Sequence, residues 1–362
     1  MNKSLSTEFS FLPKTGRAAS FASEDGAFPF FTSSQDTVKL AAEADCYGPA
    51  LVFGTGGSAS VHVVDGPFSA SNDCYVCKPN SGKMDDAKFV HYFLKSNIHL
   101  IEKGFKGAGL KHVSKKHLME LEIPTGEGID RRRVVALLDR ADGIRRKREQ
   151  ALTLADDFLT SVFLELFGDP TKVGNNEPPL SEVATISRGR FSPRPRNDPR
   201  YYNGDFPFIQ TGEIANSVSY LSEYRQTLNE AGTKVSKSFP PGTVFIAIVG
   251  ATIGATTVST RRFWCPDSVI GIVPKSQAVP AEFIEFLLRF WRPVFVATAP
   301  STARANINLQ TLNVVRIPKS DTDEPARFAE IFKRTYAFKQ KLEQMDAGLQ
   351  PALSQHAFAG DL

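Results

Sequence analysis

Cysteine is scarce in this sequence: four occur among 362 residues, too few for a disulfide framework in a chain of this size. Cys74 and Cys77 form a Cys-x-x-Cys pair, but a structural zinc ion takes four ligands. The sequence has neither a second such pair nor paired histidines. The pair lies on an expected strand, where residues three apart point to opposite faces. We therefore predict buried, reduced thiols and no metal site.

Enzyme signatures and long apolar runs are also missing. No run approaches the roughly 20 apolar residues that span a bilayer, and the N-terminus lacks a signal peptide's apolar core, so we expect a cytoplasmic protein. There is no GxxxxGK[ST] loop and no Asp/Asn-Pro-Pro-aromatic tetrapeptide. The glycines within 54–57 lie between two β-like runs with no helix behind them, which favours a hairpin turn over a nucleotide-binding loop. The sequence predicts no catalytic residue and no cofactor held by this chain.

A long amphipathic helix occurs twice in the sequence. From about 129 to 167, apolar residues recur at alternating spacings of three and four, which is typical of such a helix. The stretch from 325 to about 358 repeats the pattern. Gly348 and Pro351 predict a kink or break near the end of the second helix.

A single offset of 194 positions aligns the two halves of the chain. It places 89–95 on 283–289 and 112–124 on 306–318, as well as the first long helix on the second. Chance similarity rarely keeps one offset over about 80 residues. The chain is therefore a tandem duplication with an α+β fold, in which a mixed α/β domain precedes each long helix. The expected segments are the domains 1–126 and 171–320 and the helices 127–170 and 321–362.

Each domain is expected to contain a β-hairpin, a further strand and a core helix. The run 49–64 predicts a hairpin with a glycine turn, and 242–259 is its counterpart. The strand at 72–77 corresponds to 264–274. A helix near 85–96 and a helix at 280–291 follow, and the second is apolar on nearly all sides, which indicates a buried core helix.

Basic residues are concentrated in loops, although the net charge of +4 neither demands nor excludes a nucleic-acid partner. Five arginines occur within 188–200, where prolines stiffen the loop, and arginine suits phosphate contacts and guanine reading. A single arginine would indicate only a solvated loop; five together favour nucleic acid. The loop 103–116 is basic in the first repeat, and polar segments at 32–35 and 210–213 supply donors and acceptors for base edges. The candidate DNA-binding residues are Thr32, Ser33, Ser34, Gln35, Lys106, Lys111, His112, Arg188, Arg190, Arg194, Arg196, Gln210, Thr211, Glu213, Arg304 and Asn306.

The order of these features resembles the specificity subunit of type I restriction–modification enzymes. The motifs that carry the resemblance are LSEVATISRGRFSP, DFPFIQTGEI, INLQTLNVVRIP and the two helix ends FGDP and AFAGDL. No single motif is decisive, but their order and duplication are specific, and the resemblance covers nearly the whole chain.

The resemblance implies two target recognition domains in a pseudo-two-fold repeat, each reading one half of a bipartite, asymmetric DNA site. It further implies that the two helices pack as an antiparallel coiled coil, which sets the half-site spacing and docks two methyltransferase subunits. S-adenosylmethionine, ATP and Mg²⁺ would belong to the methyltransferase and motor-nuclease partners. The residues expected to pack the helices together are Val134, Leu138, Ala141, Phe158, Phe328, Phe332, Phe338 and Leu342.

Other functions stay open at this point. A related methyltransferase system without a motor nuclease would use the same kind of chain. A coiled-coil scaffold that bridges other proteins would not bind DNA. An enzyme with one degenerate repeat would need catalytic motifs, and their absence from the sequence argues against it.

Overall fold

The structure, a computed structural model, divides into two compact units. The first comprises Met1–Glu149 with Gln344–Leu362, and the second comprises Gln150–Glu343. The residues that the structure describes are 2–35, 39–107, 109–125, 130–298, 307–312, 314–320, 323–345 and 358.

One four-stranded sheet of the first unit is antiparallel and has the strand order β2-β9-β6-β7. Its counterpart in the second unit has the order β13-β21-β18-β19 and gains an edge strand, β15. The predicted hairpins are confirmed as β6–β7 and β18–β19, and Gly57 takes a φ of 76° in the first turn. The strands are β2 (Phe9–Phe11), β6 (Ala50–Gly54), β7 (Ser60–Val64), β9 (Cys74–Pro79), β13 (Ala184–Arg188), β15 (Tyr220–Leu221), β18 (Val244–Ala247), β19 (Thr256–Ser259) and β21 (Val269–Pro274).

A second sheet in each unit repeats a second strand order. It is β4-β3-β8-β5 in the first unit and β16-β14-β20-β17 in the second, and in both the two central strands run parallel. Matching order in both sheets confirms the tandem duplication. The strands are β3 (Phe28–Phe31), β4 (Lys39–Ala41), β5 (Cys46–Tyr47), β8 (Pro67–Ala70), β14 (Tyr202–Phe208), β16 (Gln226–Leu228), β17 (Lys237–Phe239) and β20 (Phe263–Cys265).

The segment 264–274, predicted as one strand, is two strands in different sheets. β20 ends at Cys265, and β21 begins at Val269. Pro266 has no N–H to donate to a ladder, so the chain turns there and crosses to the other sheet. Cys74 and Cys77 are buried on opposite faces of β9, as predicted: Cys77 lies in a core with Phe53 and Phe89, and Cys74 lies in the core on the other face.

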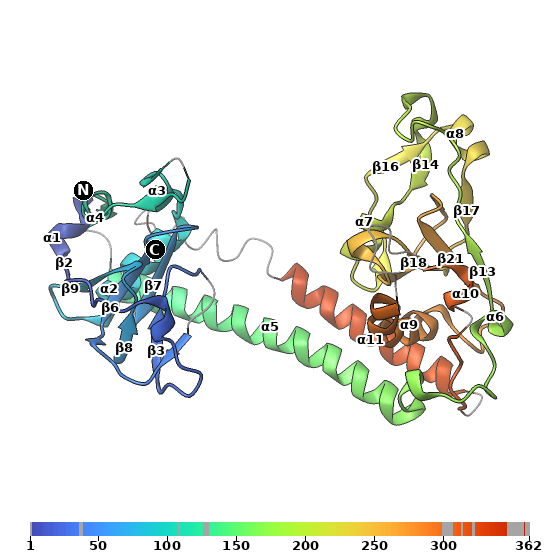
Figure 1. The fold of residues 1–362 in the computed structure, drawn as a ribbon, viewed down its shortest axis with the longest axis horizontal. Coiled ribbons are helices and arrows are strands. Elements are labelled where there is room, and N and C mark those ends of the chain that lie inside the picture. The colour runs from blue at the N-terminus through green and yellow to red at the C-terminus, as the bar shows by residue number, and fades with distance from the viewer. Residues whose placement is uncertain are drawn as a thin grey trace. The chain divides into compact units, whose positions relative to one another are not determined.

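In each unit, one helix packs on the sheet that contains the hairpin (Figure 1). α2 (Met84–Ser96) contacts β6, β7 and β9, and α9 (Ala281–Thr298) contacts β18 and β19. Both predicted helices are confirmed, and α9 continues beyond 291 through Pro293. The short elements are β1 (Asn2–Ser4), β10 (Phe105–Lys106), β11 (His112–Val113), β12 (Glu122–Pro124), α1 (Leu5–Glu8), α3 (His99–Glu102), α4 (Lys115–Met119), α6 (Leu180–Val183), α7 (Thr211–Asn216), α8 (Glu230–Val235) and α10 (Leu309–Leu312).

The two long helices are α5 (Arg131–Phe167) and α11 (Glu324–Gln344). In the second unit the end of α5 packs on the start of α11, with the ring centres of Phe163 and Phe328 5.2 Å apart. Further along α11, Lys339 Nζ lies 2.7 Å from Asp156 of α5. Contacts closer to the end of α11 thus involve residues closer to the start of α5, so the two helices are antiparallel, as expected.

Several residues predicted to join the two helices do something else. Val134 and Leu138 are buried in the core of the first unit together with Phe89, so they attach α5 to its own domain. Phe158 and Phe338 are 51% and 48% exposed, which corrects the prediction that they pack between the helices. The helix-to-helix contacts come instead from other positions, among them Phe163 with Phe328 and Asp156 with Lys339, because one partner cannot cover so wide an apolar stripe.

Phe328 and Phe332 are fully buried, as predicted, while Ala141 is buried in the first unit and Leu342 is half-buried. The kink predicted from Gly348 and Pro351 lies outside the described residues. None of the described helices is both long and apolar enough to span a lipid bilayer.

Phe358, the last described residue, makes a contact in the first unit that resembles one in the second unit. Phe358 packs its ring on Phe89 and Phe93 of α2, with centres 5.4 and 5.3 Å apart. In the second unit, Phe167 at the end of α5 packs on Phe283 of α9, with centres 4.9 Å apart. Phe283 is the repeat counterpart of Phe89, so each domain helix contacts a phenylalanine from the end of the other repeat.

Candidate nucleic-acid interface

The arginine-rich loop of the second unit follows β13, and all five of its arginines are exposed. One carboxylate organises it: Asp267, between β20 and β21, accepts a hydrogen bond from Arg196 Nη2 at 2.5 Å and lies 3.9 Å from Arg194 Nη2. The backbone carbonyl of Asp267 accepts a hydrogen bond from Arg188 Nε. Three of the predicted arginines are thus brought together at one acidic residue while their side chains stay open to solvent.

Arg188 and Arg190 also line an open hollow of about 610 Å³, together with Gly189, Ser236, Lys237 and Ser238. None of the described residues that line this hollow is acidic, so its three cations produce a locally positive surface that suits a phosphate. Arg190 is steadied by a hydrogen bond from Nη2 to the carbonyl of Ser236 (3.3 Å).

Gly189 and Lys237 complete this arrangement. A Cβ on Gly189 would lie 2.3 Å from the carbonyl oxygen of Pro266, so only glycine lets the loop pass this close to the β20–β21 turn. Lys237 was not among the predicted residues. It lies 47 positions from Arg190 in sequence and reaches it through backbone pairing, since Lys237 N donates to Arg190 O at 3.1 Å.

The polar segment 210–213 caps a helix. The Glu213 carboxylate accepts a hydrogen bond from Gln210 N at 3.0 Å, which closes a capping box at the start of α7. Gln210 Nε2 donates to Gln226 Oε1 at 2.7 Å. Thr211, the first residue of α7, is half-buried. Gln210 and Glu213 therefore have structural roles, and whether the three residues contact bases stays a prediction.

The first unit brings two of its predicted segments together. Ser33 Oγ donates to the carbonyl of Asp73 (2.7 Å) and accepts from Gly56 N (3.3 Å) in the hairpin turn. Gly56 also pairs as a β-bridge with His112, in the basic β10–β11 hairpin. Lys106 and Lys111 are exposed on that hairpin. The polar segment, the glycine turn and the lysines thus form one surface.

Other residues of the 32–35 segment are held from within the unit. Gln35 Nε2 donates to the carbonyl of Ala59 at 2.7 Å, and the His62 ring bonds the carbonyl of Ser34 at 3.1 Å. Thr32 is half-buried at the end of β3. Arg304 and Asn306, the predicted partners of the basic hairpin in the second repeat, lie outside the described residues.

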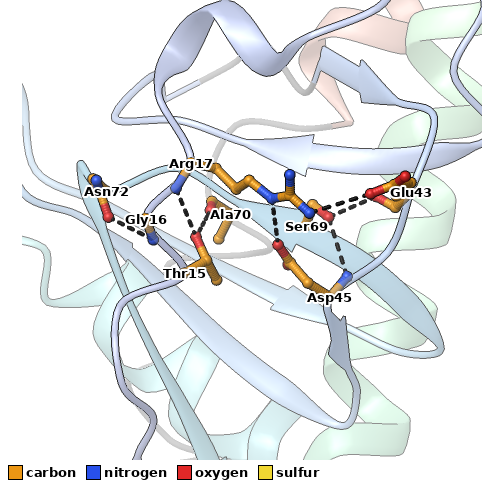
Figure 2. A network of polar contacts seen from close by, with 8 residues as sticks. All are labelled: Thr15, Gly16, Arg17, Glu43, Asp45, Ser69, Ala70 and Asn72. Atoms are coloured by element: carbon orange, nitrogen blue, oxygen red, sulfur yellow. Dashed lines mark hydrogen bonds and ion pairs between the residues drawn. The ribbon is translucent and has the colours of Figure 1, made fainter.

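Figure 2 shows a second charged network in the first unit, centred on Arg17. Its Nε lies 3.1 Å from Asp45 and its Nη2 lies 3.2 Å from Glu43. The guanidinium also lies 4.0 Å from the ring centre of Phe21. Thr15 ties this loop to the carbonyl of Ala70 at 2.6 Å. Two carboxylates offset the charge of Arg17, so this loop is electrostatically unlike the arginine-rich loop of the second unit.

The buried cysteines lack the character of nucleophiles. Burial raises the pKa of the Cys46 and Cys74 thiols to about 11, and burial also raises the pKa values of Cys77 and Cys265. Thiols this weakly acidic stay protonated at neutral pH. Among the residues described in the structure, no group of three or more His, Cys, Asp or Glu side chains is arranged to hold a metal ion.

Comparison with known proteins gives one consistent result. A family profile described as the type I restriction modification DNA specificity domain matches residues 12–132 and 173–346, one match per repeat. The specificity subunit of the type I restriction enzyme EcoDI from Escherichia coli is 24% identical over 223 residues, which are 59% of this chain and 49% of that protein. The chain therefore spans about half the length of this curated relative.

Solved structures agree at the level of the fold. The S subunit of a type I restriction–modification system from M. genitalium superposes with a TM-score of 0.67 at 12% identity, covering 100% of this chain and 96% of that one. A chain from a structure of type I restriction–modification complex assembly and conformational transition gives a TM-score of 0.53 at 18% identity, covering 98% of each chain.

Proposed function

Since this chain belongs to the family of type I restriction–modification DNA specificity domains, we propose that it is the DNA-reading subunit of a type I restriction–modification complex. Each unit reads one half of a bipartite site in double-stranded DNA. The chain itself carries out no catalysis, and the chemistry on DNA belongs to partner subunits.

The observation that carries this proposal is that the two units share a fold but present different basic surfaces. Both units have the same two strand orders. The second presents arginines around Asp267 and a hollow with Arg188, Arg190 and Lys237, whereas the first presents the lysines of the β10–β11 hairpin. Two alike domains suit two half-sites, as in dimeric repressors. Because their surfaces differ, the half-sites differ and the full site is asymmetric.

The long helices have apolar surface left over for partners. Leu154 and Phe158 of α5 are 66% and 51% exposed, and Phe338 of α11 is 48% exposed. Exposed apolar side chains in a stripe indicate a protein interface. They support docking of two methyltransferase subunits on the helices, which also set the distance between half-sites. S-adenosylmethionine, and the ATP and Mg²⁺ of restriction subunits, bind to those partners.

The test is to map methylated bases in DNA from cells that express this chain with its methyltransferase partner. The expected result is adenine methylation at a split, asymmetric motif that disappears when this chain is deleted. A matched strain carries Arg190→Glu with Lys237→Glu, which should reduce methylation while the protein level is kept. Unchanged methylation after deletion would refute the proposal in favour of a scaffold that reads no DNA.

A further inference from the structure

In each unit, an ion pair joins the domain helix to the long helix. The two pairs lie at the same repeat position, but their charges are reversed. In the first unit, Lys88 Nζ of α2 lies 2.6 Å from Asp139 of α5. In the second, Glu282 of α9 lies 3.8 Å from Lys333 Nζ of α11. The offset of 194 places Lys88 on Glu282 and Asp139 on Lys333. Both repeats therefore have an ion pair at this position. The long helix supplies the acid in the first unit, and the domain helix supplies it in the second.

A tyrosine fixes the carboxylate in both units. The Tyr92 hydroxyl donates to Asp139 Oδ1 at 2.7 Å, and the Tyr220 hydroxyl donates to Glu282 Oε1 at 2.8 Å. Tyr220 in turn packs on Phe332 of α11, with ring centres 5.9 Å apart. Each acid thus has a defined position in its interface and is not a freely rotating surface charge.

The apolar part of the two interfaces differs in size but carries no charge that would repel the other repeat. Val134 and Leu138 attach α5 to the first domain, and their larger counterparts Phe328 and Phe332 attach α11 to the second. An exchange would therefore change the packing volume, whereas the ion pairs would add repulsion between like charges. If a domain docked on the long helix of the other repeat, Lys88 would face Lys333 and Glu282 would face Asp139. Both contacts would then join like charges.

We propose that these two reversed pairs match each domain to its own long helix and reject the helix of the other repeat, in the same chain or in a second copy. Mispairing between repeats is a typical failure of duplicated proteins, and specificity of this kind needs a repulsive element as well as an attractive one. A domain transferred between the two positions must therefore bring the matching charge with it. This charge matching acts in assembly and does not depend on DNA binding.

The test replaces the charges on the long helices in the full chain. Asp139→Lys with Lys333→Glu recreates the like-charge contacts of mismatched docking and leaves the net charge unchanged. Asp139→Asn with Lys333→Gln is the control, since it has the same net charge and keeps a hydrogen-bond acceptor for Tyr92. The charge-exchanged protein should melt about 2–4 °C below the control, as expected for a loss of about 1 kcal/mol. Adding Lys88→Glu and Glu282→Lys should restore the melting temperature.

Equal melting of the charge-exchanged protein and the control would overturn the proposal, as would a failure of the added changes to restore stability. Because Glu282 is only 9% exposed, the fourfold variant can fail to fold for another reason. The pair Lys88→Glu/Asp139→Lys, compared with Asp139→Lys alone, therefore repeats the test in the first unit. There, both side chains are about one-third exposed.

Discussion

Single charged residues in this protein are positioned by acceptors of their own unit. Asp267 gathers three arginines, and the Ser236 carbonyl steadies a fourth, Arg190. A side chain that is already ordered loses less conformational entropy when it binds. Under the proposed function, the arginine-rich loop is therefore ordered before a phosphate binds.

The hollow beside this loop makes a specific prediction. Arg190→Glu with Lys237→Glu should weaken DNA binding of the assembled complex at least about 10-fold and reduce the slope of log K against log salt by about 2, since each lost phosphate contact removes roughly 0.9. The control is Arg200→Glu with Lys172→Glu, which changes the net charge by the same amount, because Arg200 and Lys172 are already paired with Asp198 at 2.7 Å and Asp169 at 3.1 Å. Equal losses in both variants, measured by salt-dependent binding, would assign the effect to net charge and not to the hollow.

His91 makes a prediction about pH. Burial lowers its pKa to about 3, and its buried Nδ1 has no hydrogen-bond partner among the described residues. The unfolded chain binds a proton at His91 near pH 6.5 and the folded protein does not, so stability from this residue is complete above pH 6.5 and declines as pH falls toward 3. The decline is at most about 1.4 kcal/mol per pH unit. His91→Leu should flatten the melting temperature between pH 6.5 and 5; an unchanged profile would contradict this.

The elements were more predictable than the side chains. Periodicity and the constant offset indicated the helices, hairpins and duplication, because an apolar face must recur at the period of its helix or strand. The partner of each polar side chain depends on contacts distant in sequence. Ser33 bonds a carbonyl 40 positions away, and no local pattern reveals this. The exposed Phe158 and the buried Leu159 are neighbours in one apolar stripe, and the sequence alone cannot tell which of them faces the other helix.

The two faces of α5 can be separated by matched substitutions. Phe163 is fully buried among rings of α9 and α11, so Phe163→Ala should lower the unfolding free energy of the second unit by about 3–5 kcal/mol. Phe158→Ala should change it by less than about 0.5 kcal/mol yet reduce co-purification with the methyltransferase. Denaturant unfolding and a pull-down measure the two effects, and a large loss of stability in Phe158→Ala would show that this face is not free for a partner.

At the scale of the whole molecule, the length of the long helices should determine the spacing of the half-sites. Four residues inserted after Arg148, within α5, add about 6 Å of helix, equivalent to about two base pairs at 3.4 Å each. Methylation mapping should reveal both half-sites unchanged and a longer gap between them. A changed half-site with an unchanged gap would mean that the helices do not set the distance.

The contact of Phe358 with α2 has a consequence for biosynthesis. Proteins generally fold their N-terminal parts first as they leave the ribosome, and the second unit here is one continuous stretch, Gln150–Glu343. Phe358 packs on Phe89 and Phe93 in the first unit, so this core closes only after residue 358 has been synthesised. The first unit is then completed after the second. Chains truncated just before residue 358 should be cut by protease in the first unit but not in the second, and chains that include residue 358 in neither.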